Sequence, residues 1–456
     1  MIDPGTLAAV LVDHLPEHLA RQRWSGAHER EITGISLRWL ELPEPGEPLL
    51  AWTLVDATFA DGGEPTYQVF VGGRRAEPLP DFLHGKEREL IGVVPDASGD
   101  IVLYDALVDP DLAIAVLHLV APDVEVEVRR PLVLEHSNSS IVFDEASILK
   151  IFRKVEPGPN PDVEITRVLS ESGYDRVLPP LAELRRDGTD LAVLREFLVG
   201  ATEGWQLART SVRDVLASRL PPEECGGDFA PDAERLGVTV AGLHVAMAAA
   251  WGSRAGDAGR WTTEMASHLD EVSASEAASI DRFTFDPAAV RKHLAAVASQ
   301  GDAGREIRIH GDLHLAQVIQ VDAGWMVLDF EGEPARIPEG RFTSSSPLRD
   351  VAGMLRSLHY AAASGLAEWD EGDQALLDLL AAWEERSRTA FLEGYYGHHG
   401  IAELLPSSAD DRDALLAAFE LDKAVYELGY ELGHRPDKVS IPLEGISRLL
   451  PPEGDA

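Results

Sequence analysis

Cysteine and long hydrophobic runs are almost missing from this chain. Its 456 residues contain one cysteine, Cys225. An internal disulfide is therefore excluded, which fits a reducing cytoplasm. No segment approaches the run of about 18 apolar residues that a membrane span needs, and the N-terminus lacks a basic-then-apolar signal pattern. We therefore expect a cytoplasmic protein without a membrane partner.

Positive charge is also scarce. Lysine and arginine total 40 residues against 78 aspartates and glutamates, which gives a formal net charge of −38. Nucleic acids and anionic membranes are disfavoured as partners, because phosphate backbones and anionic lipids bind cationic surfaces. A small nucleotide stays possible, since metal ions and a few cationic side chains can compensate its charge locally. The length allows two or three domains with cores of their own.

The most informative stretch is a predicted hairpin near residue 320. Two short apolar segments, residues 318–321 and 325–328, flank an Asp-Ala-Gly turn. His310-Gly311-Asp312 precedes the first segment, and Asp329-Phe330-Glu331 follows the second. A hairpin returns its ends to each other, so we expect the carboxylates of Asp312 and Asp329 to share one pocket.

The residues of this hairpin suit a magnesium site. Gln317 follows Asp312 by five positions and can add an amide oxygen to the two carboxylates, and Mg²⁺ prefers such hard oxygen ligands. The order of the motifs resembles the catalytic loop and metal-binding aspartate of the protein-kinase-like fold, with Asp312 as the catalytic residue and Gln317 and Asp329 as metal ligands. The alternative is a hairpin with two acidic, solvated ends; both motifs in order at this spacing favour the kinase interpretation.

A strand, a polar turn and a second strand are predicted between residues 132 and 154, followed by a helix after Pro161. Ser139 and Ser140 belong to the polar stretch, which we expect to form a turn over phosphates. Lys150 lies in an apolar strand, where a cation is costly without a partner, and Glu164 on the next helix is the candidate partner. The kinase-like fold uses such a pair to hold phosphates; the alternative is a surface lysine on an edge strand.

The rest of the chain separates into strand-rich and helix-rich parts. Residues 1–26 are predicted as a helix and residues 34–105 as an antiparallel sheet. Residues 191–198 are predicted as the last strand of this lobe, and residues 196–200 as the crossing into the next. Glu196 and Leu198 in this crossing would meet adenine if the lobe is kinase-like. From about residue 202 the pattern is helical, with helices at residues 235–250, 286–298, 374–394 and 412–433, another starting at 347, and a tail from 435 to 443.

Several motifs, in order along nearly the whole chain, are similar to those of the maltokinases and their close relatives: HSNSSIVF, ILKIFRK, PGPNPDVE, HGDLHLAQV, DFEGEPAR, PLRDVAGMLRS and FELDKAVYE. These are actinobacterial sugar kinases, and the group includes glucosamine kinases. The resemblance implies an α+β, bilobal, aminoglycoside-phosphotransferase-like fold that uses ATP and Mg²⁺. It also implies an N-terminal cap at residues 1–110, a nucleotide-binding lobe at 111–200 and a helical acceptor lobe at 201–456.

Departures from the maltokinase pattern concern the acceptor. Maltokinases carry an aromatic and a basic residue after the early Arg-Trp, whereas Ser-Gly-Ala follows Trp24 here. Their C-terminal Pro-x-Trp is Pro436-Asp-Lys in this chain, so two aromatic positions are lost. A disaccharide needs more aromatic surface than a monosaccharide. Glu420, Glu427 and Glu431 fall on roughly one side of a predicted helix, with Tyr430 nearby. A carboxylate there could pair with the ammonium of an amino sugar.

These observations favour a monomeric kinase that converts glucosamine to glucosamine 6-phosphate. The alternative is a maltokinase that makes maltose 1-phosphate, and a more remote one is a non-catalytic, ATP-binding pseudokinase. Retention of Lys150, Asp312 and Asp329 argues against the pseudokinase.

Overall fold

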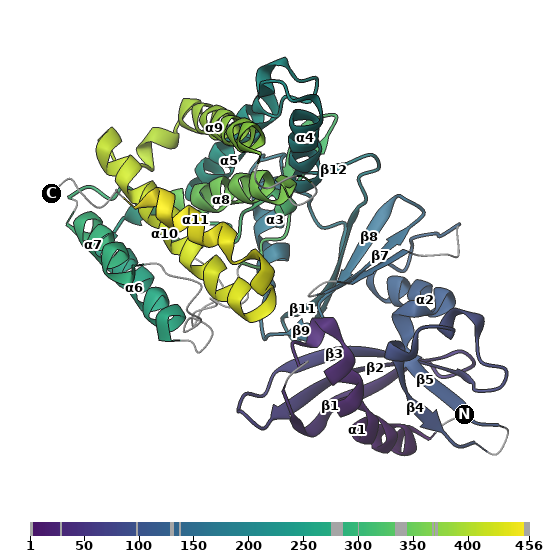
Figure 1. The fold of residues 1–456 in the computed structure, drawn as a ribbon. Helices are drawn as coiled ribbons and strands as arrows, with labels where there is room; N and C mark the ends of the chain where they lie inside the picture. Colours follow the sequence, from purple (N-terminus) through teal and green to yellow (C-terminus); the bar gives the residue numbers. More distant parts are fainter. Residues whose placement is uncertain are drawn as a thin grey trace. The chain divides into compact units, whose positions relative to one another are not determined.

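The chain forms two compact units in a computed structural model (Figure 1). Unit 1 comprises Met1–Glu164 and Pro179–Val199, and unit 2 comprises Ile165–Leu178 and Gly200–Ala456. The backbone crosses from one unit to the other three times, once within helix α3 (Pro161–Glu171). The structure describes residues 3–27, 30–96, 99–127, 132–135, 138–274, 286–299, 301–332, 344–366, 369 and 373–450.

Unit 1 begins with helix α1 (Pro4–Arg21), whose start the local sequence explains. The carboxylate of Asp3 accepts a hydrogen bond from the Thr6 amide, and Pro4 occupies the first turn, where its missing N–H costs nothing. Leucines at helical spacing (Leu7, Leu11, Leu15 and Leu19) are fully buried. They pack against a six-stranded antiparallel sheet of β1 (Ile32–Glu44), β2 (Leu49–Phe59), β3 (Thr66–Arg75), β4 (Leu90–Val94), β5 (Ile101–Asp105) and β9 (Lys154–Val155).

A second, five-stranded sheet completes unit 1, in the order β10-β11-β8-β7-β6. Helix α2 (Pro110–Val120) contributes to the core that these strands share with the first sheet. β8 is an inner strand, so Lys150 in it is no edge-strand residue: it pairs with Val193 of β11 and Ser140 of β7. The strand bounds are β6 (Leu132–Glu135), β7 (Ser139–Phe143), β8 (Ser147–Ile151), β10 (Ala182–Arg186) and β11 (Thr189–Glu196).

A buried ion pair links these two sheets. Arg153, fully buried just after β8, donates to Asp105 Oδ2 at 2.5 Å and to Ser139 Oγ at 2.8 Å. Its guanidinium lies 4.7 Å from the ring centre of Trp24. Such a desolvated charge is tolerated because the carboxylate of Asp105 pairs with it directly.

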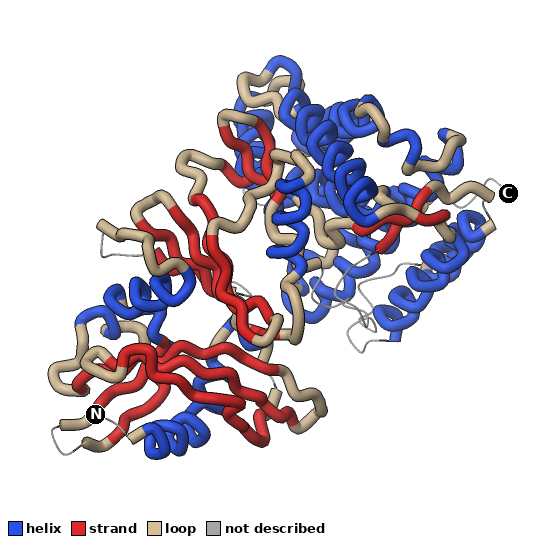
Figure 2. The backbone as a smooth tube through the Cα atoms, turned by 180° about the vertical axis from the view of Figure 1, so that it is seen from behind, coloured by secondary structure: helices blue, strands red, loops and turns tan. Residues whose placement is uncertain are grey.

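Unit 2 is mostly helical, whereas strands gather in unit 1 (Figure 2). Two of its helices, α5 and α9, approach each other at two glycines. A Cβ on Gly237 would lie 2.0 Å from the Phe391 carbonyl oxygen, and one on Gly394 would lie 2.0 Å from that of Glu234. Glycine therefore permits the close helix approach. The helices are α4 (Gly204–Ser218), α5 (Ala230–Trp251), α6 (Ala258–Ala274), α7 (Pro287–Ala298), α8 (Leu348–Gly365), α9 (Gln374–Gly397), α10 (Ala409–His434) and α11 (Ser440–Leu449).

Two small sheets join these helices. One has the strand order β12-β15-β16 and contains the predicted hairpin; the other has the order β13-β14-β17. Their bounds are β12 (Thr202–Glu203), β13 (Arg254–Ala255), β14 (Arg305–Arg308), β15 (Val318–Val321), β16 (Gly324–Val327) and β17 (Ser344–Ser345).

The predicted α+β, kinase-like fold class is confirmed. The predicted tail at residues 435–443 is wrong, because Ser440 begins helix α11, which buries Pro442, Gly445 and Ile446. The three-part division predicted from the sequence stays a prediction. No helix among the described residues is long and apolar enough to cross a membrane.

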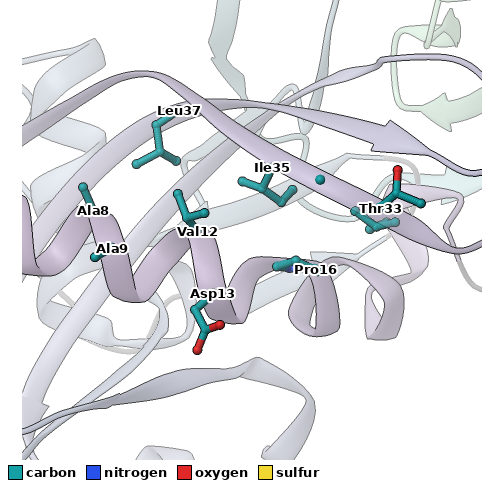
Figure 3. A pocket seen from close by; sticks show the side chains of 10 residues that line it. Ala8, Ala9, Val12, Asp13, Pro16, Thr33, Ile35 and Leu37 are labelled. Atoms are coloured by element: carbon teal, nitrogen blue, oxygen red, sulfur yellow. The ribbon is translucent and has the colours of Figure 1, made fainter.

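An open groove of about 840 Å³ runs between α1 and β1 in unit 1 (Figure 3). Ala8, Val12, Pro16, Ile35 and Leu37 give it a largely apolar lining. Its lining contains none of the site residues predicted from the sequence, so the groove is separate from the candidate site.

Candidate active site

The predicted hairpin forms in unit 2 and joins the two motifs. Val318 of β15 pairs with Val327 of β16, and Val321 pairs with Gly324 across the turn. Just before the hairpin, the Gln317 carbonyl accepts a hydrogen bond from the Leu328 amide at 2.9 Å. The segment after Asp312 is thereby held against the segment before Asp329, as the spacing predicts.

His310 connects the two ends directly. Its Nε2 lies 2.8 Å from the Leu328 carbonyl oxygen, which can only accept, so Nε2 carries the proton. The other nitrogen, Nδ1, then accepts from the Asp312 amide at 3.3 Å. His310 thus orients the backbone of Asp312 relative to the strand that leads to Asp329.

A buried carboxylate supports the same loop from helix α8. Asp350 accepts hydrogen bonds from the amides of His310 at 2.8 Å and Gly311 at 2.9 Å. His244 Nε2 lies 3.1 Å from the same carboxylate, and its Nδ1 lies 2.8 Å from the Tyr395 hydroxyl. Burial raises the pKa of Asp350, but the hydrogen bond and charge of His244 lower it. The charge of His310 and the Gly311 amide hydrogen bond act in the same direction, so the net pKa lies below its usual range. Asp350 is therefore a fixed anion that orients the catalytic loop.

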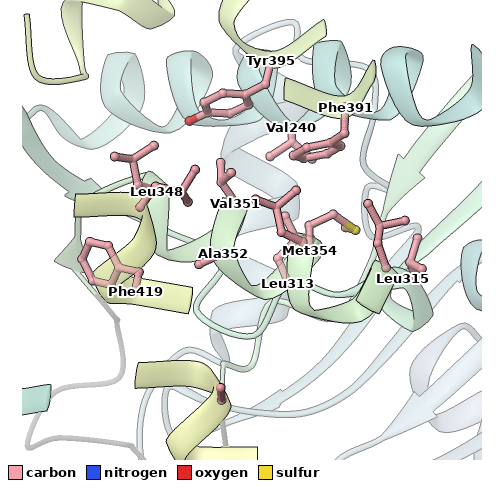
Figure 4. Packing of buried hydrophobic residues seen from close by; sticks show 14 of the residues in the cluster. Val240, Leu313, Leu315, Leu348, Val351, Ala352, Met354, Phe391, Tyr395 and Phe419 are labelled. Carbon is pink, nitrogen blue, oxygen red and sulfur yellow. The ribbon is translucent and has the colours of Figure 1, made fainter. Parts of the chain in front are cut away.

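Apolar packing holds the loop from the other side (Figure 4). Leu313 and Leu315, which flank His314, are buried in the core of unit 2 with Met354 and Phe419. Helix α8 comes so close that a Cβ on Gly353 would lie 2.5 Å from the Leu313 carbonyl oxygen. The loop that carries Asp312 is thus anchored by side chains on both sides of it.

Asp312 itself is paired with a lysine that the sequence prediction missed. Lys423 Nζ of α10 lies 3.2 Å from Asp312 Oδ1, and His314 Nε2 lies 3.8 Å from Oδ2. Burial raises the pKa of Asp312, but Lys423, His314 and His310 outweigh it and hold the pKa below its usual range. Asp312 is therefore a carboxylate at neutral pH, able to accept a hydrogen bond from a hydroxyl.

A small pocket surrounds this pair. It is lined by Gly311, Asp312, Leu313, Arg349, Asp350, Gly353, Phe419, Asp422 and Lys423. The Asp422 carboxylate is buried and lies 2.9 Å from His268 Nδ1 of α6. The pocket thus brings the catalytic loop together with the first turn of α8 and the middle of α10.

The two predicted metal ligands lie side by side. Gln317 Nε2 is 3.4 Å from Asp329 Oδ2, and a half-turn of the amide would present its oxygen instead. Asp329 adopts a positive φ of 60°, a conformation that aspartate tolerates better than most residues. An amide oxygen and a carboxylate suit a hard divalent cation, so these residues fit Mg²⁺.

Unit 1 carries the predicted phosphate lysine. Lys150 Nζ lies 3.1 Å from Asp162 Oδ2, and Arg195 Nη1 of β11 lies 2.9 Å from the same oxygen. Burial raises the pKa of Asp162, but the charges and hydrogen bonds of Arg195 and Lys150 lower it by more. The net pKa lies below its usual range, so Asp162 stays ionised. Asp162 stands two residues before the predicted partner Glu164, in the same helical turn, and the sequence prediction missed it. The role of Glu164 stays a prediction.

The turn predicted for the serines is misplaced. Ser139 and Ser140 lie in strand β7, paired with Glu135 and Leu134 of β6, and Ser139 is fully buried against Arg153. The run Ser-Ser-Ile-Val-Phe continues a strand because its apolar residues belong to the core of unit 1. The phosphate contacts predicted for these serines stay predictions.

The crossing residues follow the last strand of unit 1. Glu196 ends β11 with an exposed side chain, and Leu198 follows two residues later, partly buried. The adenine contacts predicted there also stay predictions.

The carboxylates predicted to meet the acceptor have arginine partners. Arg388 of α9 binds Glu420 at 2.8 and 2.9 Å, and the buried Arg356 of α8 binds Glu427 at 3.0 and 2.6 Å. Tyr430 is 44% exposed and stacks on His434. A substrate contact at these three residues stays a prediction, and its electrostatic reason is weaker because arginines already compensate both charges.

The fold and the braced catalytic loop define a protein-kinase-like phosphotransferase. The chain is 28% identical to a glucosamine kinase of Streptacidiphilus jiangxiensis over 71% of this chain and 73% of that protein. It is 26% identical to a glucosamine kinase of Mycolicibacterium smegmatis over 70% and 79%, respectively. Residues 18–109 match the maltokinase N-terminal cap domain.

Solved structures confirm the fold over 97% of the chain. A glucosamine kinase in complex with glucosamine, ADP and inorganic phosphate matches with a TM-score of 0.63 at 22% identity, covering 97% of this chain and 99% of that chain. Another crystal form of glucosamine kinase matches with a TM-score of 0.66 at 21% identity, with the same coverage. The chain is thus similar to the glucosamine kinases over most of its length, and its residues 18–109 are similar to the maltokinase N-terminal cap domain.

Proposed function

We propose that the protein is an ATP-dependent glucosamine kinase that forms glucosamine 6-phosphate. The observation that carries this proposal is the match to two glucosamine kinases over more than two thirds of each chain. The oriented, ionised Asp312 supports it independently, because a sugar kinase needs a group that receives the proton of the acceptor hydroxyl.

Asp312 would hold the acceptor hydroxyl. Its carboxylate accepts the hydroxyl's hydrogen bond, orients the oxygen and receives the proton as the new bond to phosphorus forms. A lowered pKa makes Asp312 a weak base. This suits phosphoryl transfer, in which positioning and charge compensation supply most of the catalysis.

Gln317 and Asp329 would hold Mg²⁺, which when bound offsets the charge of the transferred phosphoryl group. Their neighbouring positions and oxygen donors support this assignment. In unit 1, Lys150 would bind ATP phosphates with Glu164 as its predicted partner. Ser139, Ser140, Glu196 and Leu198 stay candidates for the remaining nucleotide contacts.

The charge beside Asp312 favours the 6-hydroxyl over the 1-hydroxyl. Lys423 lies 3.2 Å from the carboxylate that the reacting hydroxyl must approach. The ammonium of glucosamine sits on the carbon next to C1 and is far from O6. Transfer to O1 would therefore bring two cations together, which costs free energy in a partly buried site.

Maltose is the second candidate acceptor, and the match to the maltokinase cap domain at residues 18–109 favours it. Maltose has no ammonium, so Lys423 imposes no such electrostatic restriction on its 1-hydroxyl. The kinship with catalytic kinases argues against the pseudokinase alternative. We further propose a monomer that acts in the cytoplasm.

The decisive experiment compares both sugars with purified protein, ATP and Mg²⁺. We expect kcat/KM for glucosamine to exceed that for maltose by about tenfold or more. The position of the phosphate is read by ³¹P–¹H correlation NMR of the product, with coupling to the C6 protons expected. A preference for maltose with coupling at C1 would overturn the choice of acceptor and leave the kinase assignment standing.

A further inference from the structure

We infer that Lys423 is a positioning residue for phosphoryl transfer, which holds the Asp312 carboxylate in the orientation that meets the acceptor hydroxyl. The inference rests on the proposed kinase function and adds a residue to it.

The geometry distinguishes the two oxygens of Asp312. Lys423 Nζ lies 3.2 Å from Oδ1, whereas His314 Nε2, an imidazole whose pKa burial lowers, lies 3.8 Å from Oδ2. The side chains of Lys423 and Asp312 are only 20% and 21% exposed, so this is no ordinary surface pair. Oδ1 is thus engaged by the ammonium, and Oδ2 stays the oxygen for the hydroxyl.

Packing fixes the position of the ammonium. Lys423 sits on α10 between residues that face the core, among them Phe419, Ala424 and Val425. Helix α10 packs against α8, the helix whose Asp350 holds the catalytic loop. The same helix pair therefore sets the separation of Lys423 and Asp312, although 111 positions separate them in sequence.

Several charged or titratable groups share this environment, and three of them, Lys423, His314 and His310, lower the pKa of Asp312. From the loop and the two helices packed on it these groups are His310, His314, Arg349, Asp350, Asp422 and Lys423. Of these groups, Lys423 places its ammonium within hydrogen-bond distance of the Asp312 carboxylate, at 3.2 Å. Asp422, its sequence neighbour, contacts His268 instead.

Lys423 has a second effect as the reaction proceeds. The hydroxyl oxygen forms its bond to phosphorus, the bond from phosphorus to the ADP oxygen breaks, and the hydroxyl proton moves to Asp312. Asp312 becomes neutral, while Lys423 keeps its charge beside the group that has received the phosphate. A cation released from its carboxylate partner at that moment can stabilise the added negative charge.

The test uses Lys423→Met and Lys423→Arg, with Lys292→Met on the exposed face of α7 as the matched control. With glucosamine, ATP and Mg²⁺ we expect Lys423→Met to lower kcat about tenfold or more, with a small change in KM for ATP. Lys423→Arg should recover part of the loss. Without the lysine charge the pKa of Asp312 rises, so the acid limb of the pH profile of kcat/KM should move to higher pH.

A double-mutant cycle with Asp312→Asn separates positioning from folding. If Lys423 acts through Asp312, adding Lys423→Met to Asp312→Asn should lower kcat by less than twofold further. Additive losses, an unmoved acid limb in Lys423→Met, or failure of both Lys423→Met and Lys423→Arg to fold would overturn the inference. A wild-type protein that phosphorylates no glucosamine would overturn the proposed function, and this inference with it.

Discussion

Two polar networks, one in each unit, show how burial separates structural from functional charge. In unit 1, Arg153 and Asp105 are 0% and 1% exposed and join two sheets. In unit 2, Lys423 and Asp312 are 20% and 21% exposed and line a pocket. A substrate can reach only the second pair. We therefore expect the first network to govern folding and the second to govern turnover.

The largest effect is expected at the pocket. Asp312→Asn keeps the shape of the side chain but removes the proton acceptor, so kcat should fall by about 10² to 10⁴-fold. The melting temperature and ATP binding should change little. Asp322→Asn, in the exposed turn of the same hairpin, is the control. More than a tenth of wild-type turnover in Asp312→Asn would refute the assignment of this loop.

Breaking the buried network should instead reduce stability. Arg153→Ala leaves Asp105 as an uncompensated buried charge and should lower the free energy of unfolding by about 3–5 kcal/mol. Urea denaturation measures this, with exposed Arg23→Ala as the control. The kcat of the folded fraction should stay near wild type. A drop in kcat with unchanged stability would show that the comparison of the two networks is wrong.

Acid should weaken unit 1 through a buried histidine. Burial lowers the pKa of His18 from 6.5 to about 4, with Asp105 opposing. Between these values the unfolded chain binds a proton that the folded chain does not. His18 therefore stabilises the fold above about pH 6.5, and this contribution, about 3 kcal/mol at most, is lost as pH falls towards 4.

Hydrogen exchange at pH 7 and pH 5 measures this effect in α1 and β4. His18→Gln should flatten the pH dependence there, whereas exposed His399→Gln in unit 2 should not. Equal acid sensitivity of the wild type and His18→Gln would remove His18 as the cause.

The smallest effect is expected at Lys150. Lys150→Ala should raise KM for ATP on the order of tenfold, because a charge-assisted contact to phosphate is lost. Stability should change little, since Arg195 still compensates Asp162. Exposed Lys154→Ala is the control. A large fall in melting temperature with an unchanged KM for ATP would assign Lys150 a structural role like that of Arg153.

Local sequence patterns predicted the parts of the site that lie close together in the chain. The hairpin between Gln317 and Asp329 follows from two apolar segments and a turn. The supports of that hairpin come from far away: Asp350 lies 40 positions after His310, and His244 lies 106 positions before Asp350. No local pattern specifies such contacts.

Partners from other helices also explain why the electrostatic reason for an acceptor contact at Glu420 and Glu427 is weaker than the sequence suggests. Helical spacing placed Glu420 and Glu427 on one side of α10, but it could not show that Arg388 and Arg356 would meet them. For the same reason the sequence did not predict the contact between Lys423 and Asp312, although Lys423 lies within the motif FELDKAVYE. At Ser139 the polar neighbours favour a turn, but the apolar residues that follow belong to the core and extend the strand to include it.

The three crossings of the backbone between the units have a consequence for synthesis on the ribosome. Strand β11 occupies an inner position of the five-stranded sheet but follows residues 165–178, which belong to unit 2. Unit 1 therefore cannot close its sheet until about 196 residues have left the exit tunnel. Leu169 and Val177 belong to the core of unit 2, so they cannot be buried until the later helices of that unit have been translated. A gene cut after Val199 would supply unit 1 in full and deprive unit 2 of this first segment.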